Sequence, residues 1–159
     1  METKEYERLA SEYLDCIYRV AVNGCKNYAD AEDVVQNTFI KLLEKENEFK
    51  DDDHARKWLI RVAVNECNSF WRSPWKRHTT SLEELAQELV FSSPEKSNIY
   101  YAVRELPVKY RHIVHLYYFE DYSTKEIAQI MDLSETAVQT RLLRARQKLR
   151  EKLKEDGNE

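Results

Sequence analysis

Apolar residues recur along the first half of this chain at spacings of three and four, and no stretch alternates as a strand does. That spacing is typical of amphipathic helices. It predicts a first helix over about residues 4–24, a second that begins at Asp30 as its N-cap, and a third over about 54–72 after an acidic loop at 47–53. The second helix carries on its apolar side Val34, Val35, Phe39, Leu42 and Leu43.

The second half of the chain repeats the helical spacing with clear start and stop signals. A helix over about residues 93–106 opens with Ser and Pro and ends before Pro107, and another covers 108–119. A short helix over 123–131 opens with the Ser-x-x-Glu pattern of a capping box, and a last helix runs from Ser134 to about residue 154.

Residues 73–94 interrupt the helical pattern with Pro, Ser and Thr, and they hold at most one short helix over 82–89. We therefore predict an all-α protein with two small helical domains, at 1–72 and 95–159, joined by a flexible linker at 73–94. The second domain is predicted to contain four helices, two of which form a helix-turn-helix.

The composition excludes several classes of protein. With only 2 Gly in 159 residues, the chain has no glycine-rich phosphate-binding loop, so a nucleotide-binding enzyme fold is poorly supported. The odd set of Cys16, Cys25 and Cys67 lacks the close spacing of a zinc site, and neither zinc nor a disulfide framework is expected. No signal peptide and no long apolar run are seen, which predicts a cytoplasmic protein. No cofactor is expected.

The net charge of −4 hides a strong asymmetry. Residues 136–154 contain seven Lys or Arg and one acid, whereas residues 1–72 contain eleven basic and fifteen acidic residues. The basic end favours phosphate, and the acidic end suits a basic protein surface.

The strongest local signal is the pair of helices at 123–131 and 134–154, whose short turn is typical of a helix-turn-helix. Val138, Leu142, Ala145 and Leu149 should face inward, which leaves a polar face on the opposite side. Gln and Arg suit base edges, and Lys and Arg suit phosphates. A basic amphipathic helix with a solvated face is the alternative. The predicted DNA-binding residues are Lys125, Thr136, Gln139, Thr140, Arg141, Leu143, Arg144, Arg146 and Lys148.

The helix at 54–72 has a second polar stripe with three cations, two amides and no carboxylate, opposite a predicted apolar stripe of Leu59, Val62, Ala63, Cys67 and Phe70. Amides can read the edge of an exposed base, and aromatic rings can stack on it. Phe49, Trp58, Trp71 and Trp75 could supply such rings, although Trp58 suits a core position equally well. The stripe consists of Lys57, Arg61, Asn65, Asn68 and Arg72.

Two further features of the sequence are candidate sites. Asp33, Gln36 and Asn37 could bind a partner helix, but this segment also fits an ordinary capped amphipathic helix. His112 and His115 have a spacing that could hold a metal, yet no third ligand is evident and two surface histidines are expected. A Cys/His-dependent enzyme would reveal a metal or a reactive thiol, and nothing in the sequence indicates a catalytic residue or a small-molecule substrate.

Taken in order, these segments resemble extracytoplasmic-function (ECF) sigma factors, the small bacterial RNA polymerase specificity subunits. The resemblance covers nearly the whole chain with matching spacing. It rests on Asp-Ala-Glu-Asp-Val-Val-Gln-x-x-Phe (30–39), Trp58-Leu59-x-Arg61-Val62-Ala63-x-Asn65, Glu105-Leu106-Pro107, Ser123-x-x-Glu126-Ile127-Ala128 and Arg141-Leu142-x-Arg144-Ala145-Arg146.

The resemblance implies that residues 1–72 are sigma region 2 and 95–159 are region 4. It implies that Asn65, helix 54–72 and the loop with Phe49 read the melted −10 element, and that the outward face of 136–144 reads duplex −35 DNA. Family members are often held inactive by an anti-sigma factor, commonly a membrane-bound one. The segment implied to dock on the clamp helices of the largest subunit of core polymerase carries Asp33, Gln36, Asn37, Phe39 and Lys41.

Two departures from the family pattern affect these assignments. Asn37 stands where an acid is common, and a neutral Gln139 stands where the family often has a basic residue, so the −35 sequence is not carried over. The main alternative is a regulator that binds DNA by itself through its C-terminal helix-turn-helix. The acidic net charge argues against that alternative, because stand-alone affinity depends largely on phosphate neutralisation.

Overall fold

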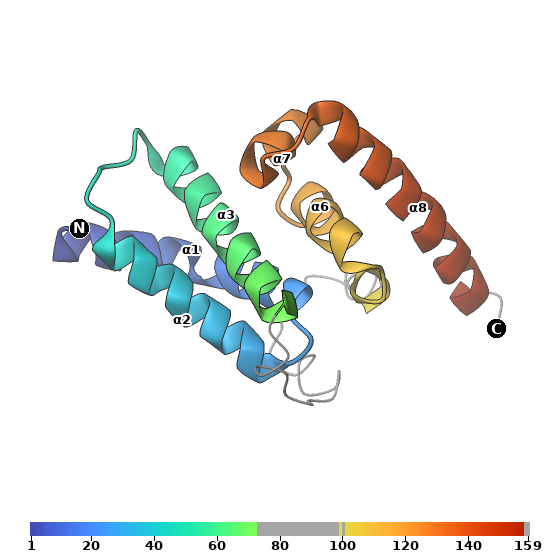
Figure 1. The fold of residues 1–159 in the computed structure, drawn as a ribbon, viewed down its shortest axis with the longest axis horizontal. Coiled ribbons are helices and arrows are strands. Elements are labelled where there is room, and N and C mark those ends of the chain that lie inside the picture. Colours follow the sequence, from blue (N-terminus) through green and yellow to red (C-terminus); the bar gives the residue numbers. More distant parts are fainter. Residues whose placement is uncertain (73–98, 100, 158–159) are drawn as a thin grey trace. The chain divides into compact units, whose positions relative to one another are not determined.

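The computed structural model describes residues 1–72, 99 and 101–157, and these belong to two compact units. Residues 1–72 lie in the first unit and 101–157 in the second (Figure 1). The six helices whose bounds are described are all α-helices, and the described residues contain no strand, which confirms the predicted all-α class. The predicted linker at 73–94 lies outside the described residues.

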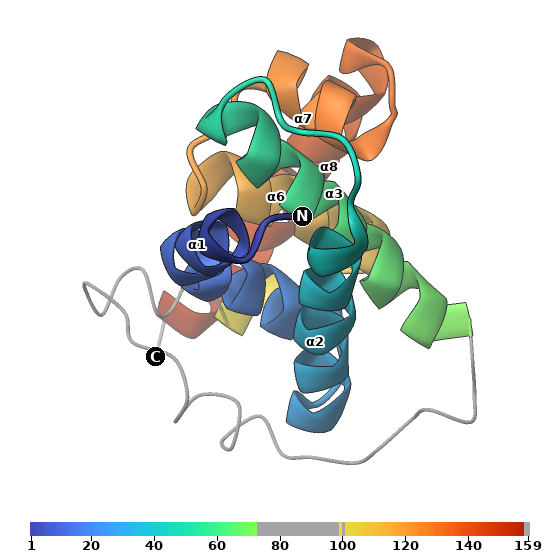
Figure 2. The same ribbon diagram turned by 90° about the vertical axis from the view of Figure 1, so that its left-hand side faces the viewer.

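The first unit is a bundle of α1 (Thr3–Gly24), α2 (Tyr28–Glu44) and α3 (Asp52–Arg72), in which each helix packs against the other two. Leu9, Ile17, Leu42 and Leu59 are fully buried at the centre of this bundle. Figure 2 shows the segment that joins α2 to α3, drawn in teal, as an extended loop that leads to the N-terminus of α3. The predicted apolar stripe of α3 is buried except for Val62, which is half-buried.

The start of α2 differs from the prediction. The N-cap is Asn27, whose side-chain oxygen accepts a hydrogen bond of 2.9 Å from the backbone N–H of Asp30. Asp30 lies in the first turn, is buried, and accepts a hydrogen bond of 3.3 Å from the Asn27 amide. An acid in the first turn interacts favourably with the helix dipole, so the same residue type suits both positions and sequence reasoning chose the wrong one.

In the second unit, α6 (Val108–Tyr118) and α7 (Thr124–Met131) pack against α8 (Glu135–Gly157) and against each other. The preceding helix, predicted over 93–106, is described only near its end, where residues 101–104 are helical. The core of this unit includes Ile113, Leu116 and Ile127, all with no exposed surface.

Three predictions about exposure were wrong. His112 and His115, expected at the surface, are only 2% and 1% exposed, because neighbouring helices surround α6 and bury five consecutive residues. Leu43, placed on the apolar side of α2, is 49% exposed, because Leu42 takes the buried position and the next residue points about 100° away.

None of the helices in the described part of the chain is long and apolar enough to cross a membrane.

Candidate nucleic-acid and partner interfaces

The turn between α7 and α8 is built by capping interactions at both helices. The Ser123 hydroxyl accepts from the N–H of Glu126, and the Glu126 carboxylate accepts from the N–H of Ser123, both at 3.1 Å, which confirms the predicted capping box. Asp132 ends α7 in the left-handed conformation (φ 54°, ψ 50°), and Ser134 caps α8 through the N–H of Ala137 at 3.1 Å. These local bonds set the direction in which α8 leaves the turn.

The packing of α8 orients its outer face as predicted. Val138, Leu142, Ala145 and Leu149 are at most 7% exposed, so they form the inner stripe. Leu143 is 56% exposed on the opposite side, which places an apolar side chain among polar ones where a thymine methyl could be contacted. The other exposed side chains on this surface are Thr136, Gln139, Thr140, Arg144, Lys148 and, from α7, Lys125.

Two of the predicted phosphate-binding arginines are less exposed. Arg141 is half-buried. The Nε of Arg146 donates a hydrogen bond of 2.8 Å to the Tyr118 hydroxyl, and its guanidinium lies 5.2 Å from the ring centroid of Tyr117. These contacts hold the Arg146 side chain against α6, so Arg146 contributes to the packing of α6 on α8 in addition to any contact with DNA.

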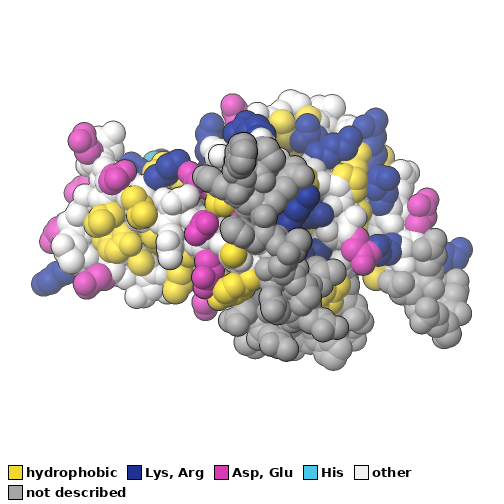
Figure 3. Space-filling model, turned by 60° about the horizontal axis from the view of Figure 1, so that its bottom comes forward, with side chains coloured by type: hydrophobic (Ala, Val, Ile, Leu, Met, Phe, Trp, Pro, Cys, Tyr) yellow, Lys and Arg dark blue, Asp and Glu magenta, His cyan; other side chains and the backbone are white. Residues whose placement is uncertain are grey.

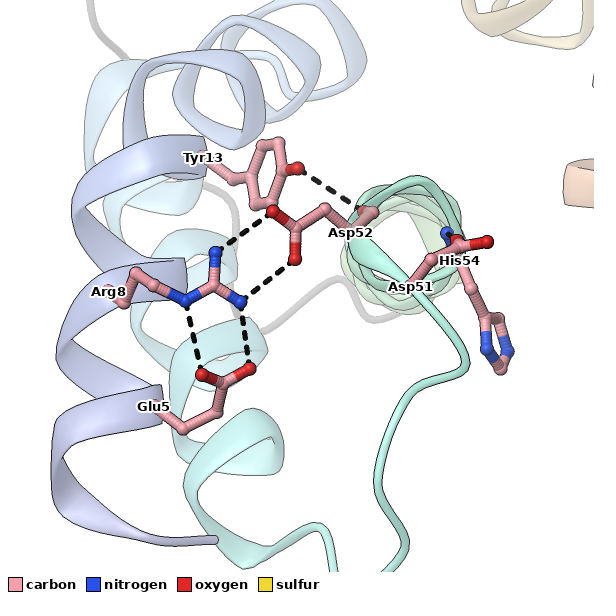
Figure 4. A network of polar contacts seen from close by, with 6 residues as sticks. All are labelled: Glu5, Arg8, Tyr13, Asp51, Asp52 and His54. Atoms are coloured by element: carbon pink, nitrogen blue, oxygen red, sulfur yellow. Dashed lines mark hydrogen bonds and ion pairs between the residues drawn. The ribbon is translucent and has the colours of Figure 1, made fainter.

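The N-terminus of α3 is anchored to α1 by a network of polar contacts (Figure 4). The Arg8 guanidinium donates to both carboxylate oxygens of Asp52, at 2.8 and 2.9 Å, and also to the carboxylate of Glu5. These hydrogen bonds lower the pKa of both carboxyl groups. The Tyr13 hydroxyl donates to the backbone oxygen of Asp52 at 3.2 Å, so two residues of α1 fix the first turn of α3.

The loop before α3 also has internal hydrogen bonds. Asp51 caps the helix by accepting from the N–H of His54 at 2.8 Å, and the Nδ1 of His54 accepts from the N–H of Lys50 at 3.1 Å. The ring of Phe49 lies edge-on to His54 and to Trp58, with centroids 5.4 and 5.5 Å apart. The half-buried Phe49 and Trp58 thus form an aromatic surface at the position predicted for stacking.

Trp71 has a different role from Phe49 and Trp58. The indole N–H of Trp71 donates to the backbone oxygen of Gly24 at 2.6 Å, and the Lys26 ammonium lies 4.5 Å from its ring centroid. Trp71 therefore ties the end of α3 to the end of α1. Trp75 lies outside the described residues.

The polar stripe of α3 is present on the surface. Arg61, Asn65 and Arg72 are exposed, whereas Lys57 and Asn68 are half-buried. The predicted stripe contained no carboxylate, but Asp53, one turn before Lys57, forms an ion pair of 3.0 Å with the Lys57 ammonium. The uncharged Asn65 lies near the middle of the helix with exposed cations before and after it.

The predicted partner-binding residues of α2 differ in exposure. Asp33, Gln36 and Lys41 are exposed and Asn37 is half-buried, but Phe39 is only 7% exposed and serves mainly as a core residue. The edge of Phe39 lines a groove of about 490 Å³ between α1 and α2, together with Tyr6, Leu14, Val35, Gln36 and Ile40.

Sequence reasoning missed the exposed apolar residues beside this groove. Leu14, Ile40 and Leu43 are 45%, 51% and 49% exposed. Figure 3 shows hydrophobic side chains gathered on one face of the first unit and Lys and Arg side chains over the second. The available signal for Leu14 and Ile40 was that neither belongs to the predicted apolar side of its helix. Exposed apolar side chains grouped in this way are typical of a protein-binding surface.

The described residues hold no group of three or more His, Cys, Asp or Glu side chains that could bind a metal. The Sγ atoms of the buried Cys25 and Cys67 lie 3.8 Å apart as thiols, and this hydrogen bond together with burial raises the pKa of Cys67. A raised pKa keeps a thiol protonated and unreactive. Two helical units, one with a helix-turn-helix and one with a groove flanked by exposed apolar side chains, are typical of a nucleic-acid-binding protein that also docks on another protein.

Comparison with known proteins specifies this class. The family model described as Sigma-70 region 2 matches residues 9–78, and that described as Sigma-70, region 4 matches residues 96–149. RNA polymerase sigma factor SigV of Bacillus subtilis is 31% identical over 87% of this chain and 86% of its own length. ECF RNA polymerase sigma factor SigM of the same organism is also 31% identical, over 87% of this chain and 88% of its length.

Solved structures agree with these matches. The structure of CnrH in complex with the cytosolic domain of CnrY has a TM-score of 0.72 and 26% identity, covering 98% of this chain and 91% of that one. The sigma factor RpoE of Bartonella quintana, solved with the anti-sigma factor NepR, has a TM-score of 0.76 at 21% identity over 96% and 98% of the chains, and shows the shared fold. The chain belongs to the ECF group of sigma-70 factors, and its function is to direct RNA polymerase to specific promoters at transcription initiation.

Proposed function

We propose that the sigma activity is divided among three surfaces of this chain. The α2 surface and the adjoining groove dock on core polymerase, the α3 face reads the melted −10 element, and the α8 face reads duplex −35 DNA. In this assignment residues 1–72 act as region 2, 73–94 as the linker and 95–159 as region 4. The chain has no catalytic activity of its own and works in the cytoplasm.

The docking surface combines exposed polar and apolar side chains. Asp33, Gln36 and Lys41 supply polar contacts, and Ile40 and Leu43 add exposed apolar area beside the groove. A mixed surface of this kind suits the core and rim of a protein interface. Phe39 contributes indirectly, because its largely buried side chain forms part of the wall of the groove.

The −10 assignment depends on the exposed amide of Asn65 and on the ring of Phe49. Extruding a base from a duplex costs a few kcal/mol, so a protein that captures the extruded base favours melting where the base matches. An amide can read the hydrogen-bonding edge of that base, and an aromatic ring can stack on its face. Arg61 and Arg72 are exposed along the same helix, where they can contact phosphates.

The observation that carries the proposal is the outward face of α8. Its inner stripe is buried, while Thr136, Gln139 and Arg144 remain exposed together. In a helix-turn-helix, the N-terminal part of the second helix is the part that enters the major groove. Gln139 and Arg144 have the donors and acceptors needed to pair with adenine and guanine edges.

We also propose that an anti-sigma factor inhibits this chain. CnrH was solved with the cytosolic domain of CnrY, and the sigma factor RpoE with the anti-sigma factor NepR. The exposed Leu14, Ile40 and Leu43 offer apolar area that such a partner could cover in competition with polymerase.

Binding to a library of double-stranded promoters, with and without bacterial core polymerase, tests the proposal. We expect sequence-specific binding and transcription only when polymerase is present, with enrichment of two separated promoter elements. Specific binding by the chain alone, unaffected by polymerase, would instead identify a stand-alone regulator and would contradict the assignments in the first unit.

A further inference from the structure

A carboxylate of α3 bonds to two residues of the proposed polymerase-docking helix. Glu66 lies one residue after Asn65, but its side chain is directed toward α2. Its Oε1 lies 2.6 Å from the ammonium of Lys41, and its Oε2 accepts a hydrogen bond of 3.3 Å from the amide of Asn37. One carboxylate therefore joins two side chains that are a helical turn apart on α2.

The bridge is more protected than an ordinary surface ion pair. The Glu66 side chain is 15% exposed, whereas that of Lys41 is 53% exposed. Both oxygens of Glu66 have a partner on α2, so its rotamer and those of Asn37 and Lys41 are defined together. The turn of α3 that carries this carboxylate also carries Asn65, the preceding residue.

We propose that Glu66 is a positioning residue that couples polymerase docking on α2 to −10 reading on α3. The inference depends on the proposed function, because it presumes that α2 contacts polymerase and that Asn65 contacts DNA. Glu66 holds Asn37 and Lys41 in the arrangement that polymerase meets, and the same bonds keep Asn65 in register.

The coupling explains the residue type at position 37. An acid there would place a second carboxylate at hydrogen-bond distance from Glu66, and two like charges so close repel each other. The Asn37 amide donates a hydrogen bond to Glu66 instead. The departure from the acid that is common at this position is thus matched to a carboxylate on the neighbouring helix.

Reversing the polarity of the bridge provides a test. Asn37→Asp should break it, because the new carboxylate faces Glu66. Adding Glu66→Gln should restore it, because a glutamine amide can donate to the new aspartate and Lys41 retains a carboxylate within one turn. Core polymerase affinity is measured for each variant, together with the rate of open-complex formation at saturating polymerase on a promoter selected with the wild-type chain.

We expect Asn37→Asp to weaken polymerase binding and to slow open-complex formation, each by about two- to five-fold, the range expected for one partly exposed ion pair. The double variant should recover most of both losses. Glu32→Gln serves as the matched control, because it removes one exposed carboxylate from α2, five residues before Asn37 and nine before Lys41. Combined with Asn37→Asp, it should restore neither measurement.

A double variant as impaired as Asn37→Asp, in chains whose thermal unfolding matches wild type, would overturn the coupling. Recovery of polymerase affinity without recovery of open-complex formation would also overturn it, since Glu66 would then act on docking alone. Failure of the wild-type chain to bind polymerase would contradict the proposed function itself, which separates the two failures.

Discussion

The two proposed DNA-reading helices differ in how their charges are arranged. On α8, the exposed Arg144 and Lys148 form no ion pair within the described residues, so their charge is available to phosphates. In the first unit, Asp53 of α3 forms an ion pair with Lys57, and Glu66 of α3 forms one with Lys41 of α2, so carboxylates neutralise both cations. Phosphate neutralisation dominates the affinity of duplex binding. The difference favours the proposed assignment of the second unit to duplex DNA and of the first unit to melted DNA in the polymerase complex.

The largest expected effect tests whether the two units are stabilised separately. Leu59→Ala in the first unit and Ile127→Ala in the second each remove a fully buried side chain. We expect each to destabilise its own unit by about 2–5 kcal/mol, the usual cost of such a cavity, and to leave the other nearly unchanged. Amide hydrogen exchange read by mass spectrometry resolves the two units. Equal loss of protection in both units from either variant would mean that they unfold as one.

Acidification should destabilise the second unit first. Burial, assisted by the nearby His115 and Arg111, lowers the pKa of His112 to about 3. The unfolded chain binds a proton near pH 6.5 and the folded chain does not, so stability is lost as the pH falls below about 6.5, by about 2 kcal/mol at pH 5. His112→Leu should abolish this dependence. Unfolding midpoints at pH 7 and pH 5 that are equal in the wild-type chain would exclude it.

Single substitutions on the two reading faces should separate the two promoter elements. Gln139→Ala removes a side chain that can pair with a base edge, and we expect about a ten-fold loss of discrimination at one −35 position. Asn65→Ala should lower open-complex formation by a similar factor while polymerase affinity changes little. Promoter-library selection with holoenzyme measures the first, and permanganate footprinting measures the second. An unchanged −35 profile would reject Gln139, and equal losses of docking and melting would reject Asn65.

The smallest expected effect compares the helix caps of the two units. Asn27→Ala removes the cap of α2, and Ser123→Ala removes the side-chain half of the capping box of α7. Each should cost about 1 kcal/mol of its own unit's stability. Because Asn27 is buried and Ser123 is exposed, the loss should be larger for Asn27. Denaturant unfolding followed by tryptophan fluorescence measures the loss for Asn27→Ala, since all three Trp residues lie from position 58 to 75. Amide hydrogen exchange of the second unit measures the loss for Ser123→Ala. A larger loss of unfolding free energy for Ser123→Ala would show that burial does not determine how much a helix cap stabilises its unit.

The amino-acid sequence alone determined the helical class and much of the helix-turn-helix. Ser123 and Glu126 specify their capping box through bonds between near neighbours, and the spacing of Val138, Leu142 and Ala145 already predicts which face of α8 is buried. Caps and buried faces depend on residues within one or two turns of the same helix, so the local sequence pattern is enough to predict them.

Only the tertiary structure decided which side chains meet across helices. Nothing near Glu66 in the sequence indicates that it reaches Lys41 and Asn37, and nothing near Arg8 indicates that it anchors Asp52. His112 and His115 are buried because other helices surround α6, which a single-helix pattern does not contain. The packing of three helices sets these contacts, since a side chain's burial and partners depend on every element that surrounds it.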